Sequence, residues 1–265
     1  RMSYDRGSGE FFVVVFCFSG VLFPQSNKIL VTAHRGASSY APENTIASIK
    51  EAIKMKADNA EIDVQETSDG EIILLHDGNL KRTTGYDKNI WEASYAEVKK
   101  LDAGSWFSEK YKGEPVPRFA ALLDAIKKKI HLNIELKTNG HEQKLADRAV
   151  KILKDKHLEH NCYFTSFDYK QIKRVKEIDP TIKTGLIFSS MPKDMDVFTS
   201  DFEILSVGYN LVDADFVKKA KENNKEIHVW TVDDETEMKR LIDLGVTSIL
   251  TNAPDKLIKL LAEKK

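Results

Sequence analysis

Ionisable side chains interrupt short apolar runs in the first third of the chain. His34 follows the run I-L-V-T-A, His76 follows I-I-L-L, and Glu61 and Asp63 alternate with apolar residues. Charged groups in apolar surroundings cost free energy unless they pair with each other or hold an ion. In a strand, Glu61 and Asp63 share one face, where two carboxylates repel each other. A bound cation is the simplest relief of that repulsion.

A third carboxylate recurs in the same kind of pattern further along. In H-L-N-I-E-L-K, Asn133, Glu135 and Lys137 alternate with apolar residues and share a strand face. Three oxygen ligands without cysteine favour a hard cation, Ca²⁺ or Mg²⁺, over structural zinc. The pattern therefore predicts one divalent cation held by Glu61, Asp63 and Glu135.

The neighbouring residues indicate the chemistry that such a cation would serve. Two histidines beside a cation are typical of a general acid and a general base, because imidazole titrates near neutral pH. Arg35 follows His34 directly, and its guanidinium suits a phosphate oxygen. A lone histidine at a strand end is more often structural, so the prediction depends on the whole set.

These motifs, in their order and spacing, resemble the glycerophosphodiester phosphodiesterase family from about Ile29 to Leu261. The motifs are H-R-G-x5-P-E-N-T, E-I-D-V-Q, H-D, L-D-A-G-S-W-F and I-E-L-K. The resemblance implies that His34 and His76 are the acid–base pair. It also implies that the 2-hydroxyl of the glycerol attacks first, giving a cyclic phosphate that water then opens. Nothing in the spacing shows that step.

The chain departs from the family pattern at two places. It has V-P-R-F-A-A-L where the family usually has I-P-T-L-E-E, so Arg118 and Ala120 differ. It also has Thr251-Asn252 where the family often has Thr-Asp. An asparagine keeps a hydrogen-bonding group but carries no charge, so the role of Asn252 stays open.

Strand and helix patterns alternate along residues 28–265. Counting from Lys28 gives eight strand-then-helix units, with the unit after Phe188 poorly formed, which predicts an α/β fold of the (β/α)8 TIM-barrel type. The exception follows the second strand, where residues 78–117 are too long and irregular for a simple connection. We expect this segment to be a small inserted subdomain, as the resemblance also implies.

In such a barrel the active site lies at the C-terminal ends of the strands. The polar residues named above all fall at predicted strand ends, so we expect them to gather at one mouth. There Arg35 and Lys137, together with the cation, would neutralise charge on a phosphoryl group. Phe167 and Trp230 would form an apolar wall for the glycerol or alcohol. Core filling by Trp230, or a plain buried ion pair of Lys137 with Glu61 and Asp63, are the alternatives.

Composition excludes some partners. The 265 residues carry a net charge of −1 and are 42% hydrophobic and 31% charged, which fits a soluble globular domain. No polyanion-binding field is implied, and we expect no nucleic-acid partner. Two cysteines, Cys17 and Cys162, form no disulfide framework, and we expect both to be unpaired.

Residues 1–27 form an N-terminal tail in which Phe11–Phe23 is almost wholly apolar. The run is too short for a spanning helix of about 20 residues, but it fits a signal-type segment or the end of a membrane segment. A buried strand is the alternative. We expect an extracytoplasmic domain, tethered or secreted, although a cytoplasmic one stays open; an envelope glycerol-phosphate polymer is then a possible substrate.

The sequence predicts metal-dependent hydrolysis of a small-molecule glycerophosphodiester to glycerol phosphate and an alcohol. Two other functions remain open. One is a phospholipase D-like or lysophospholipase activity on the same scaffold. The other is a barrel that binds an anionic ligand without turnover.

Overall fold

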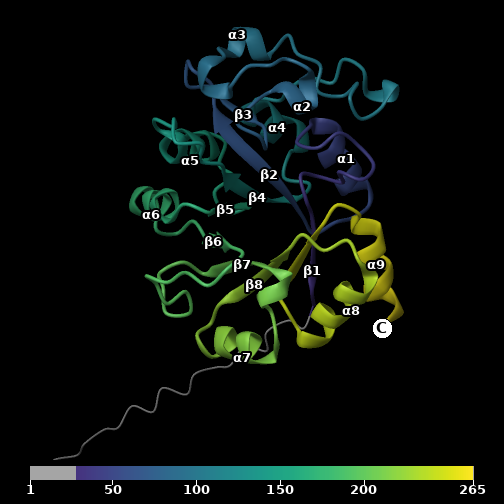
Figure 1. Ribbon diagram of the computed structural model, residues 1–265, viewed down its shortest axis with the longest axis vertical. Helices are drawn as coiled ribbons and strands as arrows, with labels where there is room; N and C mark the ends of the chain where they lie inside the picture. Colours follow the sequence, from purple (N-terminus) through teal and green to yellow (C-terminus); the bar gives the residue numbers. More distant parts are fainter. Residues whose placement is uncertain (1–27, 265) are drawn as a thin grey trace, which may run out of the picture.

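The computed structural model describes residues 28–264, which form a closed barrel of eight parallel strands (Figure 1). The sheet order is β1-β9-β8-β7-β6-β5-β4-β2-β3, and a further β1–β2 pairing closes the barrel. This confirms the predicted (β/α)8 class. The parallel strands are β1 Leu30–Ala33, β2 Asn59–Glu66, β4 His131–Leu136, β5 Cys162–Ser166, β6 Thr184–Phe188, β7 Ile204–Gly208, β8 Glu226–Trp230 and β9 Ser248–Thr251.

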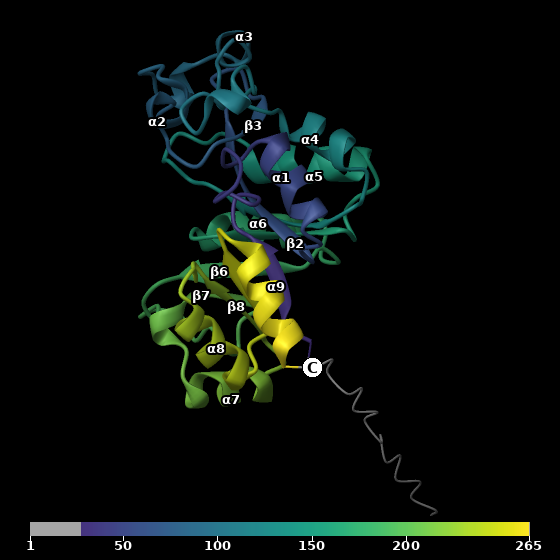
Figure 2. The same cartoon turned by 90° about the vertical axis from the view of Figure 1, so that its right-hand side faces the viewer.

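Helices follow most of the strands and cover the outside of the barrel (Figures 1 and 2). Their apolar faces pack on the sheet, as amphipathic sequences require. Caps begin and end them: the Thr45 side chain accepts from Ser48 N before α1, and Gly245 ends α8 in the left-handed conformation. The outer helices are α1 Ile46–Lys54, α4 Phe119–Ile126, α5 Leu145–Asp155, α6 Tyr169–Ile178, α7 Ala214–Glu222, α8 Glu235–Leu244 and α9 Pro254–Glu263; the short 3₁₀ helix η3 spans Tyr209–Leu211.

The sequence places the start of α5 too early. Its pattern predicts a helix from His141, whereas α5 begins at Leu145. The reason is Glu66, whose carboxylate accepts from the backbone N of Gln143 and of Lys144 (2.6 and 3.1 Å) and from Arg148 (2.6 Å). A side chain from β2 therefore accepts from the N–H groups of the two residues just before this helix, and residues 141–144 stay outside it.

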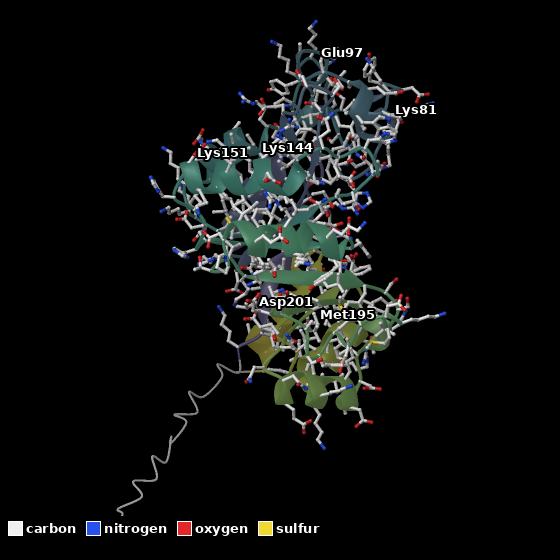
Figure 3. All side chains as sticks on the ribbon, turned by 90° about the vertical axis from the view of Figure 1, so that its left-hand side faces the viewer. Lys81, Glu97, Lys144, Lys151, Met195 and Asp201 are labelled. Atoms are coloured by element: carbon white, nitrogen blue, oxygen red, sulfur yellow. The ribbon has the colours of Figure 1, made fainter. Side chains whose placement is uncertain are left out.

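The unit after β6 has no helix. Residues 189–203 run between β6 and β7 as turns, bends and irregular backbone, which matches the poorly formed unit expected after Phe188. Val197, Phe198 and Phe202 from this segment are buried in the core that the second half of the barrel shares. These three apolar side chains therefore pack in the place where a helix would otherwise cover the sheet. Met195 and Asp201 mark this segment in Figure 3.

An insertion follows β2 and lies at one end of the molecule (Figure 2). It starts with β3 Ile72–Leu74, which pairs antiparallel with β2. Short helices follow: α2 Lys81–Thr84, η1 Ile90–Glu92, α3 Tyr95–Val98 and η2 Glu109–Tyr111. Its apolar residues form a core of their own, with Leu80, Ile90 and Val98 fully buried. Lys81 and Glu97 mark it in Figure 3.

Within residues 28–264, no helix has the length and apolar character needed to cross a bilayer. The predictions for residues 1–27, including the apolar run 11–23 and Cys17, lie outside the described residues. Cys162 is buried and forms no disulfide within residues 28–264.

Candidate active site

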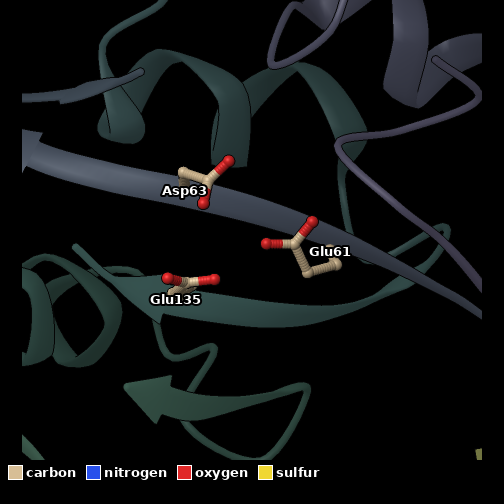
Figure 4. A group of neighbouring side chains, drawn as sticks. All are labelled: Glu61, Asp63 and Glu135. Atoms are coloured by element: carbon tan, nitrogen blue, oxygen red, sulfur yellow. The ribbon is translucent and has the colours of Figure 1, made fainter. Parts of the chain in front are cut away.

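Three carboxylates converge at the mouth of the barrel (Figure 4). Glu61 and Asp63 come from one face of β2, and Glu135 comes from the neighbouring β4, directly opposite Asp63 in the strand register. One ligand oxygen from each lies within 4.8 Å of the others. The structure thus brings together the three residues that the sequence predicted as metal ligands. Parallel pairing is the reason, because it aligns equivalent strand positions.

Burial makes this cluster electrostatically costly. Burial, followed by Asp63 and Glu135, raises the pKa of Glu61 well above its usual range. Burial, followed by Asp63, raises the pKa of Glu135 to about 7. Glu61 Oε1 is buried and makes no hydrogen bond with the residues that the structure describes. An unpaired buried oxygen in a set of carboxylates suits a divalent cation, so the acidic cluster could hold a metal.

Lys137 supplies part of the balancing charge. Its ammonium lies 3.0 Å from Glu135 Oε1 and 3.8 Å from Asp63 Oδ1. The buried ion pair considered from the sequence therefore exists in part, with Glu135 as its nearer partner. Lys137 and Arg35 face three buried carboxylates here, so these two cationic side chains do not balance the cluster when all three carboxylates are ionised.

The loop after β1 places Arg35 at the edge of the cluster. Its backbone N donates to Glu61 Oε2 (2.8 Å), and its guanidinium lies 3.0 Å from Glu43 and 3.5 Å from Asp63. Arg35 and Gly36 both have positive φ, 55° and 81°, which turns the chain sharply above the strand end. The turn is what lets one residue present both its backbone N–H and its side chain to the carboxylates.

Asn44 fixes Asp63 from the same loop. Its Nδ2 donates to Asp63 Oδ2 (2.8 Å), and its Oδ1 accepts from Asp63 N (3.0 Å). One Asp63 oxygen is thereby occupied, while the other faces Lys137. The P-E-N-T part of the first motif thus orients a predicted ligand.

His34 lies at the end of β1, and Asn252 contacts its ring on the side away from the carboxylates. Nδ1 lies 2.7 Å from Asn252 Oδ1, and Nε2 lies 3.9 Å from Glu61 Oε2. Burial, followed by the charge of Arg35, lowers the pKa of His34. The imidazole is therefore favoured in its neutral form, with Nε2 on the side of the carboxylates.

His76 is held in a parallel way on the other side of the cavity. Its Nδ1 lies 2.7 Å from Asp77 Oδ1. The side-chain amide of Gln65 donates to three successive carbonyls, those of Leu75, His76 and Asp77 (2.7, 3.2 and 2.9 Å). β2 therefore positions the backbone that carries His76.

A cavity of about 130 Å³ joins these groups. Phe167, which is 51% exposed, and Trp230 meet edge to face with ring centroids 5.7 Å apart, and Lys137 lies 5.8 Å over the Phe167 ring. The cavity has an apolar side and a charged side, as a small phosphorylated ligand requires. Its lining includes His34, Arg35, Glu61, His76, Glu135, Lys137, Phe167 and Trp230; Asp63 adjoins it through the carboxylate cluster.

The family model described as "Glycerophosphoryl diester phosphodiesterase family" matches residues 34–256. The chain belongs to this family. A glycerophosphodiester phosphodiesterase of Caldanaerobacter subterraneus subsp. tengcongensis is 36% identical over 88% of this chain and 98% of that protein. One from Bacillus subtilis is 36% identical over 86% of this chain and 85% of that protein.

A solved structure supports the fold. The phosphodiesterase of Oleispira antarctica, solved in complex with the product sn-glycerol-3-phosphate, superimposes with a TM-score of 0.83. It is 31% identical over 88% of this chain and 96% of that one.

Several residues that contact the partners of the two histidines were not predicted from the sequence as site residues. Asp77 and Glu43 lie in the H-D and P-E-N-T motifs, but neither motif indicates what they contact. Asp233 and Arg82 are ordinary charged residues until the fold brings Asp233 to Asn252, and Arg82 to Asp77 and Glu43.

Proposed function

We propose that the protein hydrolyses glycerophosphodiesters to glycerol phosphate and an alcohol, with a divalent cation at Glu61, Asp63 and Glu135. The observation that carries the proposal is the convergence of this acidic cluster and both histidines on one small cavity. A cation bound there would neutralise charge that builds on the phosphoryl oxygens.

The chain's own residues account for the rest of the chemistry. Arg35 and Lys137 flank the cluster and would bind the remaining phosphate oxygens. Each histidine has its Nδ1 occupied, by Asn252 or by Asp77, which leaves Nε2 for substrate. The apolar pair Phe167 and Trp230 would pack on the glycerol carbons.

The proposed reaction has two steps, each with one proton accepted and one donated. In the first, the glycerol 2-hydroxyl attacks phosphorus and loses its proton to one histidine. The bond from phosphorus to the alcohol oxygen breaks, and the other histidine protonates that oxygen. In the second, water opens the cyclic phosphate with the two roles reversed.

The test is release of glycerol phosphate from glycerophosphocholine and glycerophosphoethanolamine with Ca²⁺, with Mg²⁺ and with chelator. His34→Ala and His76→Ala should each lower kcat by about 10²- to 10⁴-fold. His160→Ala, at an exposed histidine, is the matched control and should retain activity. A substrate without the 2-hydroxyl should not be cleaved.

Other results would change the assignment. Turnover of micellar lysolipid but not of either soluble diester would indicate a lysophospholipase D instead. No turnover, with cation-dependent binding of sn-glycerol-3-phosphate retained, would indicate a binding barrel.

We also propose an extracytoplasmic location and, with it, an envelope glycerol-phosphate polymer as a further substrate. The support is the apolar run 11–23 of the sequence alone. A reporter that is active only outside the cytoplasm, fused after residue 265, tests the location. Release of glycerol phosphate from purified envelope polymer tests the substrate.

A further inference from the structure

Asn252 connects His34 to a carboxylate that no motif predicts. It follows β9 directly, and its Oδ1 lies 2.7 Å from His34 Nδ1, 218 residues away in sequence. The same oxygen accepts from Ser38 Oγ at 2.8 Å. On its other side, Asn252 Nδ2 donates to Asp233 Oδ2 at 2.6 Å.

Asp233 determines which way the amide of Asn252 points. Its Oδ1 accepts from Asn252 N and from Thr251 Oγ1, both at 2.8 Å. An ionised carboxylate only accepts hydrogen bonds, so the NH₂ end of the amide must face Asp233. The oxygen end must then face His34 and Ser38.

The orientation of that amide decides the tautomer of His34. An amide oxygen has no proton to donate, so the hydrogen bond to it requires a proton on Nδ1. In the neutral ring, Nε2 then carries a lone pair. Nε2 is the nitrogen on the side of Glu61.

We propose that Asp233 and Asn252 are positioning residues that fix the Nδ1–H tautomer of His34 and so present Nε2 to the cavity as a proton acceptor. The inference rests on the proposed function, in which His34 exchanges a proton with substrate. It adds how the ring is prepared for that exchange.

The neutral amide explains why an asparagine suits this position. The site already holds three buried carboxylates, and Asn252 passes on the orientation set by Asp233 without adding a fourth charge beside His34. The other histidine is held differently, because Asp77 contacts His76 directly with a carboxylate. The two rings therefore have partners of different charge.

Nitrogen NMR of the protein labelled with ¹⁵N-histidine reads the tautomer without any turnover. Spectra at about pH 8.5, where exposed histidines are neutral, would be recorded with Ca²⁺ and with Mg²⁺. A His34→Gln spectrum identifies the His34 signals. We expect the Nδ1–H form in the wild type and in Asn252→Asp, which keeps an acceptor.

Two variants should shift the population towards the Nε2–H form. Asn252→Ala removes the acceptor. Asp233→Asn retains the size of the side chain but lets the Asn252 amide turn over, since an amide at 233 can donate as well as accept. Asn223→Ala is the matched control, because the Asn223 side chain donates to Lys219 O at the C-terminal end of α7.

Kinetics on glycerophosphocholine distinguish positioning from a general loss of structure. Asn252→Ala should lower kcat by about 10- to 100-fold, as removal of an outer hydrogen bond does elsewhere, and leave KM within about threefold. Asn252→Asp keeps the acceptor but adds a charge beside Asp233, so it should restore only part of kcat. If circular dichroism shows that Asn252→Ala does not fold, the tautomer and kcat are measured on Asp233→Asn instead.

An Nε2–H tautomer in the wild type would overturn the proposal. So would an unchanged tautomer and kcat in Asn252→Ala. A wild type that cleaves no diester but shows the expected tautomer shifts would refute the proposed function and leave this inference standing.

Discussion

The guanidinium of Arg82 donates hydrogen bonds to both carboxylate oxygens of Asp77. Nε lies 2.7 Å from Oδ2, and Nη2 lies 3.1 Å from Oδ1. Arg82 belongs to the insertion, and Asp77 holds the ring of His76. Arg82 also donates to both oxygens of Glu43, in the loop after β1 (2.7 and 2.9 Å). One side chain of the insertion therefore contacts both the residue that holds His76 and the loop after β1.

Arg82→Ala should therefore impair the positioning of His76, although Arg82 itself is not proposed to contact the substrate. The Arg82 hydrogen bond holds the pKa of Asp77 at about 2, and its loss frees Asp77 to rotate away from His76. We expect kcat on glycerophosphocholine to fall by about 10- to 100-fold. Arg174→Ala, at an arginine that pairs with Asp147 on the outer helices, is the control. Equal kcat in the two variants would contradict this role.

The affinity for the proposed cation should rise with pH. Because burial raises the pKa of Glu135 to about 7 in the metal-free fold, a cation must displace a proton below that pH. Affinity for Ca²⁺ or Mg²⁺ by titration calorimetry should increase by up to about tenfold per pH unit between about pH 5 and 7. Affinities equal at pH 6 and 8 would refute the displaced proton.

The same shift has a consequence for stability, with the opposite sign. A carboxyl whose pKa is raised on folding binds its proton more tightly in the folded state, so the metal-free fold is favoured at low pH. This contribution is lost as pH rises from about 4, the unfolded value, through about 7. Thermal unfolding in chelator should show the loss in the wild type and a smaller one in Glu135→Gln. Glu92→Gln, at an exposed insertion residue, should behave as the wild type.

Gly36→Ala should destabilise the fold. A Cβ at Gly36 would lie 2.4 Å from Ser48 Oγ and 2.7 Å from the Ser48 backbone carbon, and φ is +81°. We expect the free energy of unfolding to fall by about 2–4 kcal/mol in denaturant titration. Gly113→Ala isolates the backbone contribution, because φ is +83° there with nothing within 4 Å, and should cost about 1–2 kcal/mol. Equal losses would show that the Ser48 contact costs nothing.

Phe167→Ala should weaken substrate binding more than chemistry. The ring is half exposed and packs against Trp230, so its removal should raise KM about three- to tenfold with kcat little changed. Tyr86→Ala, at an exposed aromatic of the insertion, should change neither constant. A fall in kcat at constant KM would mean that Phe167 orders the reacting groups rather than the glycerol.

The sequence by itself determined the residues of the acidic cluster and the alternation of strands. The alternation of polar and apolar residues around Glu61, Asp63 and Glu135 is a local property of the sequence. It places these side chains on one face of their strand in any sheet. The barrel class followed from the order of elements, and parallel pairing then had to bring equivalent strand ends together. Trp230 and Phe167 could be placed near the mouth for the same reason.

The tertiary structure alone decided what holds His34, and what holds Asp77 beside His76. Asn252 meets His34 only because β9 pairs with β1, and Arg82 meets Asp77 and Glu43 only because the insertion folds back over the mouth. The segment 189–203 replaces a helix with buried Phe198 and Phe202, which no periodicity indicates. Such contacts depend on side chains far apart in the chain, and a local pattern carries no record of them.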